Sequence, residues 1–211
     1  MVLQVDVISD VICPWCYIGK RRLEKATAAV GGPVAVRWLP FQLNPAMPKE
    51  GVSRQEYRTK KFGSWERSQE LDARVVAVGE ADGIHFAFDR IERTPNTLDA
   101  HRLVRLAERQ GVQDAVVEAL FRAYFTEGQD ISNRQTLLDV VADAGLDRHG
   151  AEATLNSDDG LEAVKDADAL ASQFYVEGVP FFIVNGTLTL SGAQQPRAFL
   201  AVFRQATGSQ G

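Results

Sequence analysis

The sequence contains few of the residues that build metal centres or disulfide frameworks, and no segment suited to a membrane. It has two cysteines and three histidines in 211 residues. A membrane-spanning helix needs about 18 or more apolar residues in a row, and no run approaches this length. Residues 1–10 contain no Lys or Arg ahead of their apolar run, unlike a secretory signal. We therefore expect a cytoplasmic protein without a membrane partner.

Neither a nucleic acid nor a metal ion is indicated as a partner. The formal net charge is -5, and the basic residues form no stripe. A zinc site needs about four ligands, usually with a second Cys pair or a His pair, whereas His85, His101 and His149 are scattered. With 45% hydrophobic residues, the chain can bury a core in one domain or in one domain with an insertion.

The two cysteines form a single Cys13-Pro14-Trp15-Cys16 motif directly after an apolar run at residues 5–8. A strand that ends there and becomes a helix at Pro14 leaves Cys13 facing unpaired N–H groups and the positive end of the helix dipole. Both favour a thiolate. Proline suits the first helical turn because its missing N–H has no partner there in any case.

Two other interpretations of the pair are weaker. A structural disulfide across so short a loop would remove little chain entropy. Two buried cysteines could also serve as small hydrophobes, but this spacing between a strand and a helix would then be a coincidence. In a cytoplasmic protein a lone Cys pair of this kind is more often catalytic or metal-binding. Redox chemistry is therefore favoured.

Residues 3–9 and 34–43 are predicted strands with a helix at 14–30 between them, which gives a right-handed βαβ unit with parallel strands. From residue 53 to about residue 156 the pattern is nearly all helical. Helices are expected at 53–62, 65–80, 94–110, 112–125 and 132–145, with caps at Ser53, Thr94-Pro95 and Ser132. The one candidate strand in this region is residues 84–88.

A further helix is expected after Asp158-Asp159, ending at Phe174. Strands at residues 181–184 and 187–190 flank Asn185-Gly186, a strong hairpin turn signal, and a last helix follows at 197–207. A βαβ half followed by a ββα half is the thioredoxin-like layout. We predict an α/β protein with a thioredoxin-like domain, residues 1–50 and 158–211, interrupted by an all-helical insertion domain, residues 51–157.

Three separated motifs carry a family resemblance: residues 9–20 around the cysteines, Asn96-Thr97 with His101-Arg102, and residues 178–182 with Ser191-Gly192-Ala193-Gln194. In this order they resemble the DsbA-like family of thioredoxin-fold oxidoreductases, specifically its FrnE-like branch, over almost the whole chain. The resemblance implies that Pro180 is a cis-proline facing the dithiol. It also implies that Asn96 and His101 line the active-site groove, although a lone His on a helix is usually structural.

Thiol chemistry then predicts the roles of the two sulfurs. Cys13, at the open end of the helix, attacks a disulfide, and Cys16, one turn further in, resolves the mixed disulfide. The Cys13–Cys16 pair is thus the redox group, with no bound cofactor and with glutathione as a candidate reductant. Expected substrates are proteins or small thiols and disulfides. Trp15 adds no positive charge, so we expect a weaker oxidant than family members with histidine there.

Other residues have less specific roles. Asp6 and Asp10 are alternative proton acceptors for the dithiol, and a turn role is equally open for Asp10. Exposed backbone at Val179, with Pro14 and Trp15 beside it, could hold an extended peptide. Lysine and arginine usually extend into water, so a solvated helix face is expected for Lys20, Arg21 and Arg22.

Two alternative functions remain. Kappa-class glutathione transferases and 2-hydroxychromene-2-carboxylate isomerases resemble this chain in having a helical insertion, but they carry a serine in place of the first cysteine and bind glutathione. The full dithiol favours disulfide exchange. A chaperone-like binder that uses the groove without redox turnover is the third interpretation. Substrate, redox direction and oligomeric state do not follow from the sequence.

Overall fold

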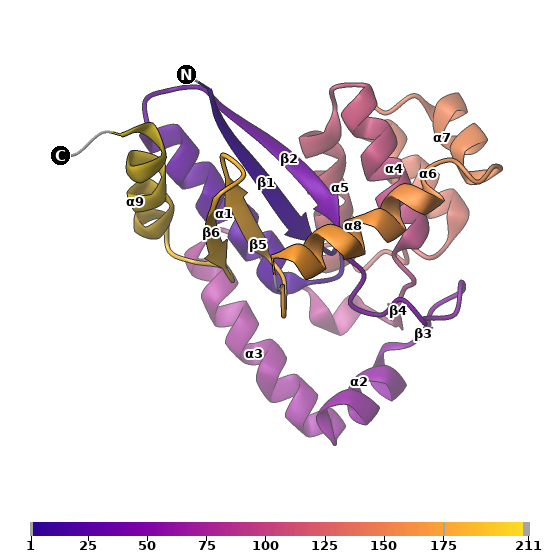
Figure 1. Cartoon of the computed structure of the whole chain (residues 1–211). Coiled ribbons are helices and arrows are strands. Elements are labelled where there is room, and N and C mark those ends of the chain that lie inside the picture. Colours follow the sequence, from indigo (N-terminus) through magenta and orange to yellow (C-terminus); the bar gives the residue numbers. More distant parts are fainter. Residues whose placement is uncertain (1, 175, 209–211) are drawn as a thin grey trace.

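The computed structural model describes residues 2–174 and 176–208. Its main sheet has the strand order β2-β1-β5-β6. Strand β1 (Leu3–Ser9) runs parallel to β2 (Val34–Pro40) and antiparallel to β5 (Phe181–Val184), and β6 (Leu188–Ser191) forms the other edge. Figure 1 shows the first strands and the C-terminal hairpin side by side in this sheet. The predicted α/β class, with its βαβ and ββα halves, is confirmed.

The βαβ unit closes through α1 (Pro14–Ala29), which packs against α9 (Pro196–Thr207). Strand β2 ends three residues before the predicted end. After Pro40 the backbone turns, and the N–H of Leu43 donates to the Asp10 carboxylate at 2.8 Å instead of continuing the ladder. The turn therefore lies beside the start of α1.

The two faces of the sheet bury different side chains. Because successive strand residues point to opposite faces, Val5 and Val7 join Phe182, Phe199 and Phe203 in the main buried cluster under α1 and α9. The opposite face buries a smaller cluster, made up of Ile8, Leu39, Phe181 and Ile183, against which Phe174 packs.

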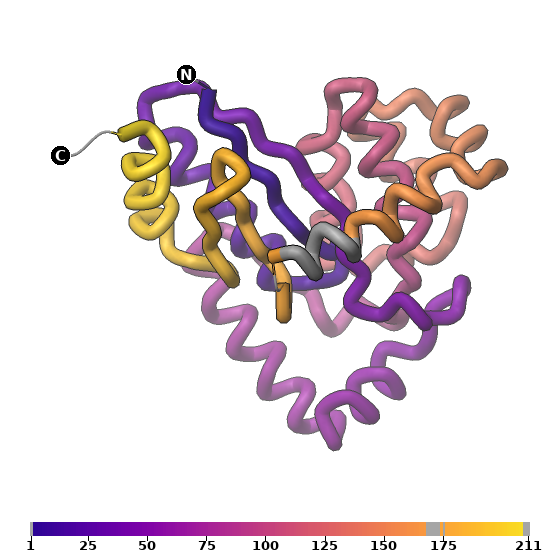
Figure 2. The backbone as a smooth tube through the Cα atoms, viewed as in Figure 1, coloured from indigo at the N-terminus to yellow at the C-terminus, as the bar shows by residue number. Residues whose placement is uncertain are grey.

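Between β2 and β5 the chain is mostly helical. The helices are α2 (Arg54–Phe62), α3 (Trp65–Ala81), α4 (Leu98–Arg109), α5 (Gln113–Phe125), α6 (Arg134–Asp143), α7 (Arg148–Leu155) and α8 (Leu161–Gln173). In Figure 2 this segment leaves the sheet after β2. Its last helix, α8, contacts β2, an edge strand of the sheet. The main buried cluster continues from the sheet into these helices as far as Leu155. Sheet and helices therefore share one core.

Three local predictions in this region are wrong. Residues 84–87 form no strand, because the N–H groups of Ile84 and Ala87 donate to the carbonyl oxygens of Gly79 in α3 and Phe125 in α5, and a 3₁₀ turn follows at Phe88–Arg90. Helix α4 begins at Leu98, since Thr94 belongs to β4 (Arg93–Thr94), which pairs with β3 (Val52–Ser53).

The third difference concerns the start of α6. Its N-cap is Asn133, whose side chain accepts from the N–H groups of Gln135 and Thr136. Ser132 instead donates to the backbone oxygen of Glu50 at 3.1 Å and to Asp130.

The C-terminal hairpin is confirmed, but β6 begins one residue later than predicted, because Leu188 pairs with Val184 and Thr187 lies in the loop. Asn185 and Gly186 have φ values of 48° and 74°. A two-residue hairpin turn of the favoured kind needs positive φ at both positions, which Asn and Gly adopt most readily. The hairpin places Pro180, the residue before β5, at the same end of the sheet as the start of α1.

Candidate active site

The two cysteines lie where β1 passes into α1. Cys13 is the N-cap of α1 and has extended backbone angles, and its carbonyl oxygen accepts the N–H of Cys16 at 3.0 Å. Both are free thiols; Cys13 is 5% exposed and Cys16 is fully buried. Pro14 is half-buried in the first turn, whereas Trp15 is 40% exposed. The predicted strand-to-helix placement of the dithiol is confirmed.

The loop before β5 reaches across to the first cysteine. The Cys13 thiol donates to the carbonyl oxygen of Val179 at 3.5 Å, and the Val179–Pro180 peptide bond is cis. Pro180 is buried and Val179 half-buried. The structure thus brings Cys13, Val179 and Pro180 together, as the family resemblance implies.

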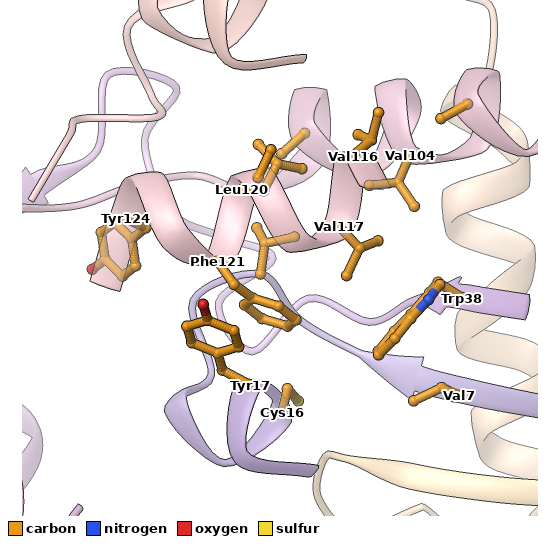
Figure 3. Close-up of a cluster of buried hydrophobic side chains, with 14 of the residues drawn as sticks. Val7, Cys16, Tyr17, Trp38, Val104, Val116, Val117, Leu120, Phe121 and Tyr124 are labelled. Atoms are coloured by element: carbon orange, nitrogen blue, oxygen red, sulfur yellow. The ribbon is translucent and has the colours of Figure 1, made fainter. Parts of the chain in front are cut away.

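Cys16 lies in an apolar environment. In Figure 3 it sits beneath the rings of Tyr17 and Phe121, which stack with centroids 5.0 Å apart. Burial raises the pKa of the Cys16 thiol well above its usual range, and the neighbouring Cys13 sulfur raises it further. Contacts with the Ser9 side chain and the Asp10 backbone oppose this rise. Cys16 is therefore held protonated in the reduced protein.

The raised pKa of Cys16 predicts that the reduced protein loses stability above about pH 8.5. The unfolded chain releases the Cys16 proton near this pH while the folded chain retains it, so the free energy of unfolding falls by up to about 1.4 kcal/mol per pH unit. Denaturant unfolding under reducing conditions at neutral and alkaline pH should show a larger fall for the wild type than for Cys16→Ser. An equal fall would mean that Cys16 ionises in the folded protein.

Gly19 allows α1 to approach the loop that carries Pro180. A Cβ atom at this position would lie 2.9 Å from Cγ of Pro180 and 3.1 Å from Cζ of Phe182. The absence of a side chain at Gly19 therefore determines how closely the loop can lie against the helix that carries the dithiol.

Gly19→Ala is expected to lower the free energy of unfolding by about 1 kcal/mol. Alanine gains about 1 kcal/mol in helix propensity, but overpacking a core site costs about 1–3 kcal/mol, and the Pro180 ring cannot rotate away. Denaturant unfolding tests this. Gly32→Ala is the matched control, because a Cβ there meets nothing within 4 Å. A Gly19→Ala variant more stable than the wild type would contradict the packing argument.

Asp10 and His101 form a buried pair behind the dithiol. The Asp10 carboxylate is fully buried, with His101 Nε2 3.2 Å from one oxygen and the Leu43 N–H on the other. The Asp10 carbonyl oxygen also accepts the N–H of Cys13 at 3.0 Å. His101 is 2% exposed and lies behind the groove rather than on it. The pair holds the turn before Cys13.

Asp6 and Asn96 are not brought to the dithiol. Asp6 makes two hydrogen bonds with Arg37, at 2.8 and 2.9 Å, on the sheet face opposite Val5 and Val7 and therefore opposite α1. The Asn96 side chain donates to the Met47 carbonyl oxygen and accepts the N–H of Leu98, the first residue of α4. The structure therefore shows no contact with the dithiol that would support the predicted proton transfer by Asp6 or the predicted groove position of Asn96.

Lys20, Arg21 and Arg22 were predicted to lie on a solvated face of α1, and this prediction is wrong for two of them. Lys20 has a side chain only 2% exposed and pairs with Asp114, Glu118 and Glu24. Arg22 is buried against Asp82 at 2.7 Å. These side chains join α1 to distant parts of the chain instead of entering water.

A cavity of about 430 Å³ opens beside Cys13. Its lining joins Ile12, Pro14 and Trp15 to residues of α2 and α3, including Arg54, Arg58 and Lys61. These three cations were not among the predicted site residues. Their spacing of four and three residues was the available signal, since it places them on one face of a helix.

Residues 2–174 and 176–208 contain neither a metal-binding cluster nor a membrane-spanning helix. That part of the chain contains no group of three or more His, Cys, Asp or Glu arranged to hold a metal ion. None of its helices is both long and apolar enough to cross a membrane.

Comparisons with known proteins agree with this geometry. The model of the DSBA-like thioredoxin domain matches residues 4–204. The Bacillus subtilis protein YwbO, described as uncharacterized, is 27% identical over 192 residues, which cover 89% of this chain and 90% of YwbO. A crystal structure described as a probable DsbA oxidoreductase from Streptomyces coelicolor is 31% identical, has a TM-score of 0.91, and is matched over 99% of this chain and 92% of that one.

Two more distant structures share the fold. The cytosolic disulfide reductase DsbM from Pseudomonas aeruginosa is 22% identical with a TM-score of 0.69, over 98% of this chain and 100% of that one. A 2-hydroxychromene-2-carboxylate isomerase is 18% identical with a TM-score of 0.70, over 100% of both chains. Because the family model spans almost the whole sequence, the chain belongs to the DSBA-like thioredoxin domain family and has the fold of the DsbA-like thiol-disulfide oxidoreductases.

Proposed function

We propose that the chain is a thiol-disulfide oxidoreductase or isomerase that acts through the Cys13–Cys16 dithiol. The observation that supports this best is the difference between the two sulfurs. Cys13 lines the cavity and contacts the Val179 carbonyl, whereas Cys16 is fully buried and does not line the cavity. A nucleophilic thiolate must reach its substrate, so Cys13 attacks and Cys16 resolves.

The reaction has two exchange steps. The Cys13 thiolate attacks one sulfur of a substrate disulfide, forms a mixed disulfide and releases the other substrate sulfur as a thiolate. Cys16 then loses its proton and attacks Cys13, which releases the second substrate thiolate and forms the Cys13–Cys16 disulfide. Two electrons pass to the substrate, and oxidation of a substrate dithiol runs the same steps in reverse.

The pKa of Cys16 suits this order of events. Part of its rise comes from the hydrogen bond and the charge of Cys13. Once Cys13 is bound in a mixed disulfide, that charge is gone, so the Cys16 proton leaves more easily. The resolving step is thereby favoured after the first step and disfavoured before it.

The surroundings of Cys13 suit extended protein substrates or small disulfides. The Val179 backbone, with Pro14 and the exposed Trp15, forms the groove in which a substrate chain would lie beside the sulfur. We further propose a cytoplasmic location, glutathione as a reductant, and membership of the FrnE-like branch. The fold likeness to a cytosolic disulfide reductase is compatible with the location.

A glutathione-dependent isomerase of the 2-hydroxychromene-2-carboxylate type is the alternative. The likeness to such an isomerase extends to the fold, but the presence of both sulfurs, one of them at the cavity, favours disulfide exchange. Isomerisation that survives Cys13→Ser would favour the alternative.

Equilibration with glutathione redox buffers tests the proposed function. The reduced and oxidised forms are separated by alkylation and mass measurement. We expect one two-electron transition. A reduction potential of the dithiol near that of cytosolic glutathione indicates a reductase or isomerase, and a much higher reduction potential indicates an oxidant. If the dithiol fails to exchange with any glutathione buffer and with insulin, the proposed function is wrong.

A further inference from the structure

The cavity beside Cys13 has the size of a small-molecule site. Its volume of about 430 Å³ lies within the usual range for such sites, roughly 300–1,000 Å³. Its walls come from the start of α1, from α2 and α3, and from Tyr124 and Phe125 at the end of α5. A molecule in it would therefore lie against the attacking sulfur at one end and against helices α2 and α3 along its length.

The described lining of the cavity carries an excess of positive charge. Its cations are Arg54, Arg58, Lys61 and Arg74, whereas Asp72 is the one carboxylate among the described lining residues. The whole chain has a formal net charge of -5, so this patch has the opposite sign to the molecule. A cleft lined by one sign of charge concentrates ligands of the other sign.

Arg54, which is buried, and Arg58, which is half-buried, share that single carboxylate. Arg54 and Arg58 each approach one Asp72 oxygen at 2.7 Å, and their side chains are 5% and 17% exposed. Burial lowers the pKa of Arg58, Asp72 opposes this, and the charge of Arg54 lowers it again. The single Asp72 carboxylate therefore balances only one of the two guanidinium charges. An anion entering the cavity would supply the second negative charge.

Aromatic rings line the same cavity. Tyr57, Phe62 and Phe88 contribute faces, and Arg54 lies 5.3 Å from the Phe88 ring while Arg58 lies 4.8 Å from that of Phe62. The guanidinium groups are thus held in place by rings on one side and by Asp72 on the other. A ligand with an apolar body and an acidic end matches both components.

We propose that this cavity binds a low-molecular-weight disulfide carrying carboxylate groups, with its sulfur–sulfur bond at Cys13 and its carboxylate towards Arg58 and Arg74. This inference rests on the proposed dithiol function. Cys13 attacks one sulfur and releases one small thiolate. Cys16 then attacks Cys13 and releases the other. One substrate disulfide is reduced to two thiols as the Cys13–Cys16 dithiol becomes a disulfide, so electrons balance without a further reductant.

Three aliphatic disulfides of similar size but different charge test the proposal: dithiodipropionate, a dianion; bis(hydroxyethyl) disulfide, which is neutral; and cystamine, a dication. The rate at which each oxidises the reduced protein is followed by tryptophan fluorescence, since Trp15 lies between the two cysteines. Each rate is divided by the rate of the same disulfide with a free thiol. We expect a dianion-to-neutral ratio on the order of ten, with cystamine slowest, and a fall in this ratio at high salt.

Single substitutions then test which cations of the cavity lining produce the preference for the dianion. Arg58→Gln should lower the dianion-to-neutral ratio about threefold, the size expected for one partly exposed charge. Arg58 also binds Ser68 and Asp72, so Arg74→Gln is a second variant that removes a lining cation at an exposed position. Arg67→Gln, on α3 but outside the cavity lining, is the control and should leave the ratio unchanged.

The outcomes separate this inference from the proposed function. Equal normalised rates for the three probes, or equal ratios in all variants, would overturn the anionic substrate while exchange itself stands. Preference for an acidic peptide disulfide, with no preference among the small probes, would also overturn it. If none of the probes oxidises the dithiol, the proposed function fails first.

Discussion

Cys13→Ser is expected to abolish disulfide exchange, and Cys16→Ser to stop it halfway. Without the Cys13 sulfur no mixed disulfide can form, because Cys16 is fully buried and lies outside the cavity lining. The turnover rate should fall by about three orders of magnitude or more, as when a catalytic nucleophile is removed. In Cys16→Ser the first step remains, but nothing inside the protein can displace the product.

Intact-mass measurement under non-reducing conditions distinguishes the two variants. After exposure to a small disulfide, Cys16→Ser should gain the mass of one half-molecule, and Cys13→Ser should gain none. Serine is a favourable N-cap residue, so Cys13→Ser retains the start of α1 and should fold like the wild type. An adduct on Cys13→Ser and none on Cys16→Ser would reverse the two roles. An absence of adducts on both would contradict exchange at this site.

The dithiol and the hairpin could be predicted because their signals are local. Pro14 directly after Cys13 marks the first turn of α1, and Asn185-Gly186 supplies the two positive φ values that a tight hairpin requires. Neighbouring residues alone determine such features. The N-caps of α4 and α6 were predicted at the wrong residues because several consecutive polar residues could cap each helix. Thr94 and Ser132 make tertiary contacts instead, so later residues take the N-cap positions.

Asp6 shows a signal that was present in the sequence and not used. Val5 and Val7 are apolar and flank it in a strand, so side-chain alternation already places Asp6 on the face away from the residues next to α1. The ion pair with Arg37, the residue opposite it in β2, follows from the parallel register. The alternation therefore already argued against the predicted role of Asp6 as a proton acceptor for the dithiol.

The surroundings of the dithiol depend on contacts between residues far apart in the sequence. Lys20 is buried because Asp114 and Glu118 of α5 face it, and no pattern within α1 indicates their presence. The same holds for the cavity. The spacing of Arg54, Arg58 and Lys61 predicts a basic helix face, but only the tertiary structure turns that face towards Cys13.

Arg22 and Asp82 form the most buried ion pair of α1 and join three parts of the fold. Their side chains are 9% and 7% exposed, and Arg22 Nε donates to Asp82 at 2.7 Å. Asp82 caps the end of α3, and Arg22 also donates to the Ala193 carbonyl oxygen in the loop after β6. The exposed Lys25 binds the second oxygen of Asp82 at 2.7 Å. The helix that carries the dithiol is thereby tied to α3 and to the C-terminal half.

Asp82→Asn is expected to lower the free energy of unfolding by about 3–5 kcal/mol, because it leaves the buried Arg22 cation without its counter-charge. Glu70→Gln, which breaks the exposed Arg67–Glu70 pair, is the control and should cost less than about 1 kcal/mol. Denaturant unfolding at neutral pH measures both. A loss for Asp82→Asn no larger than that of the control would show that Arg22 finds other compensation.

The pH dependence of this loss provides an independent check. Burial alone would raise the pKa of Asp82, but the hydrogen bonds from Lys25 and Arg22 more than offset this and hold the pKa below its usual range. A carboxyl group with a lowered pKa stabilises the fold above its unfolded value of about 3.9, and this contribution is lost as the pH falls through the folded value. The difference in stability between the wild type and Asp82→Asn should therefore be constant near neutrality and shrink below about pH 4. A difference that stays constant into acid would mean that the carboxylate charge is not what stabilises this junction.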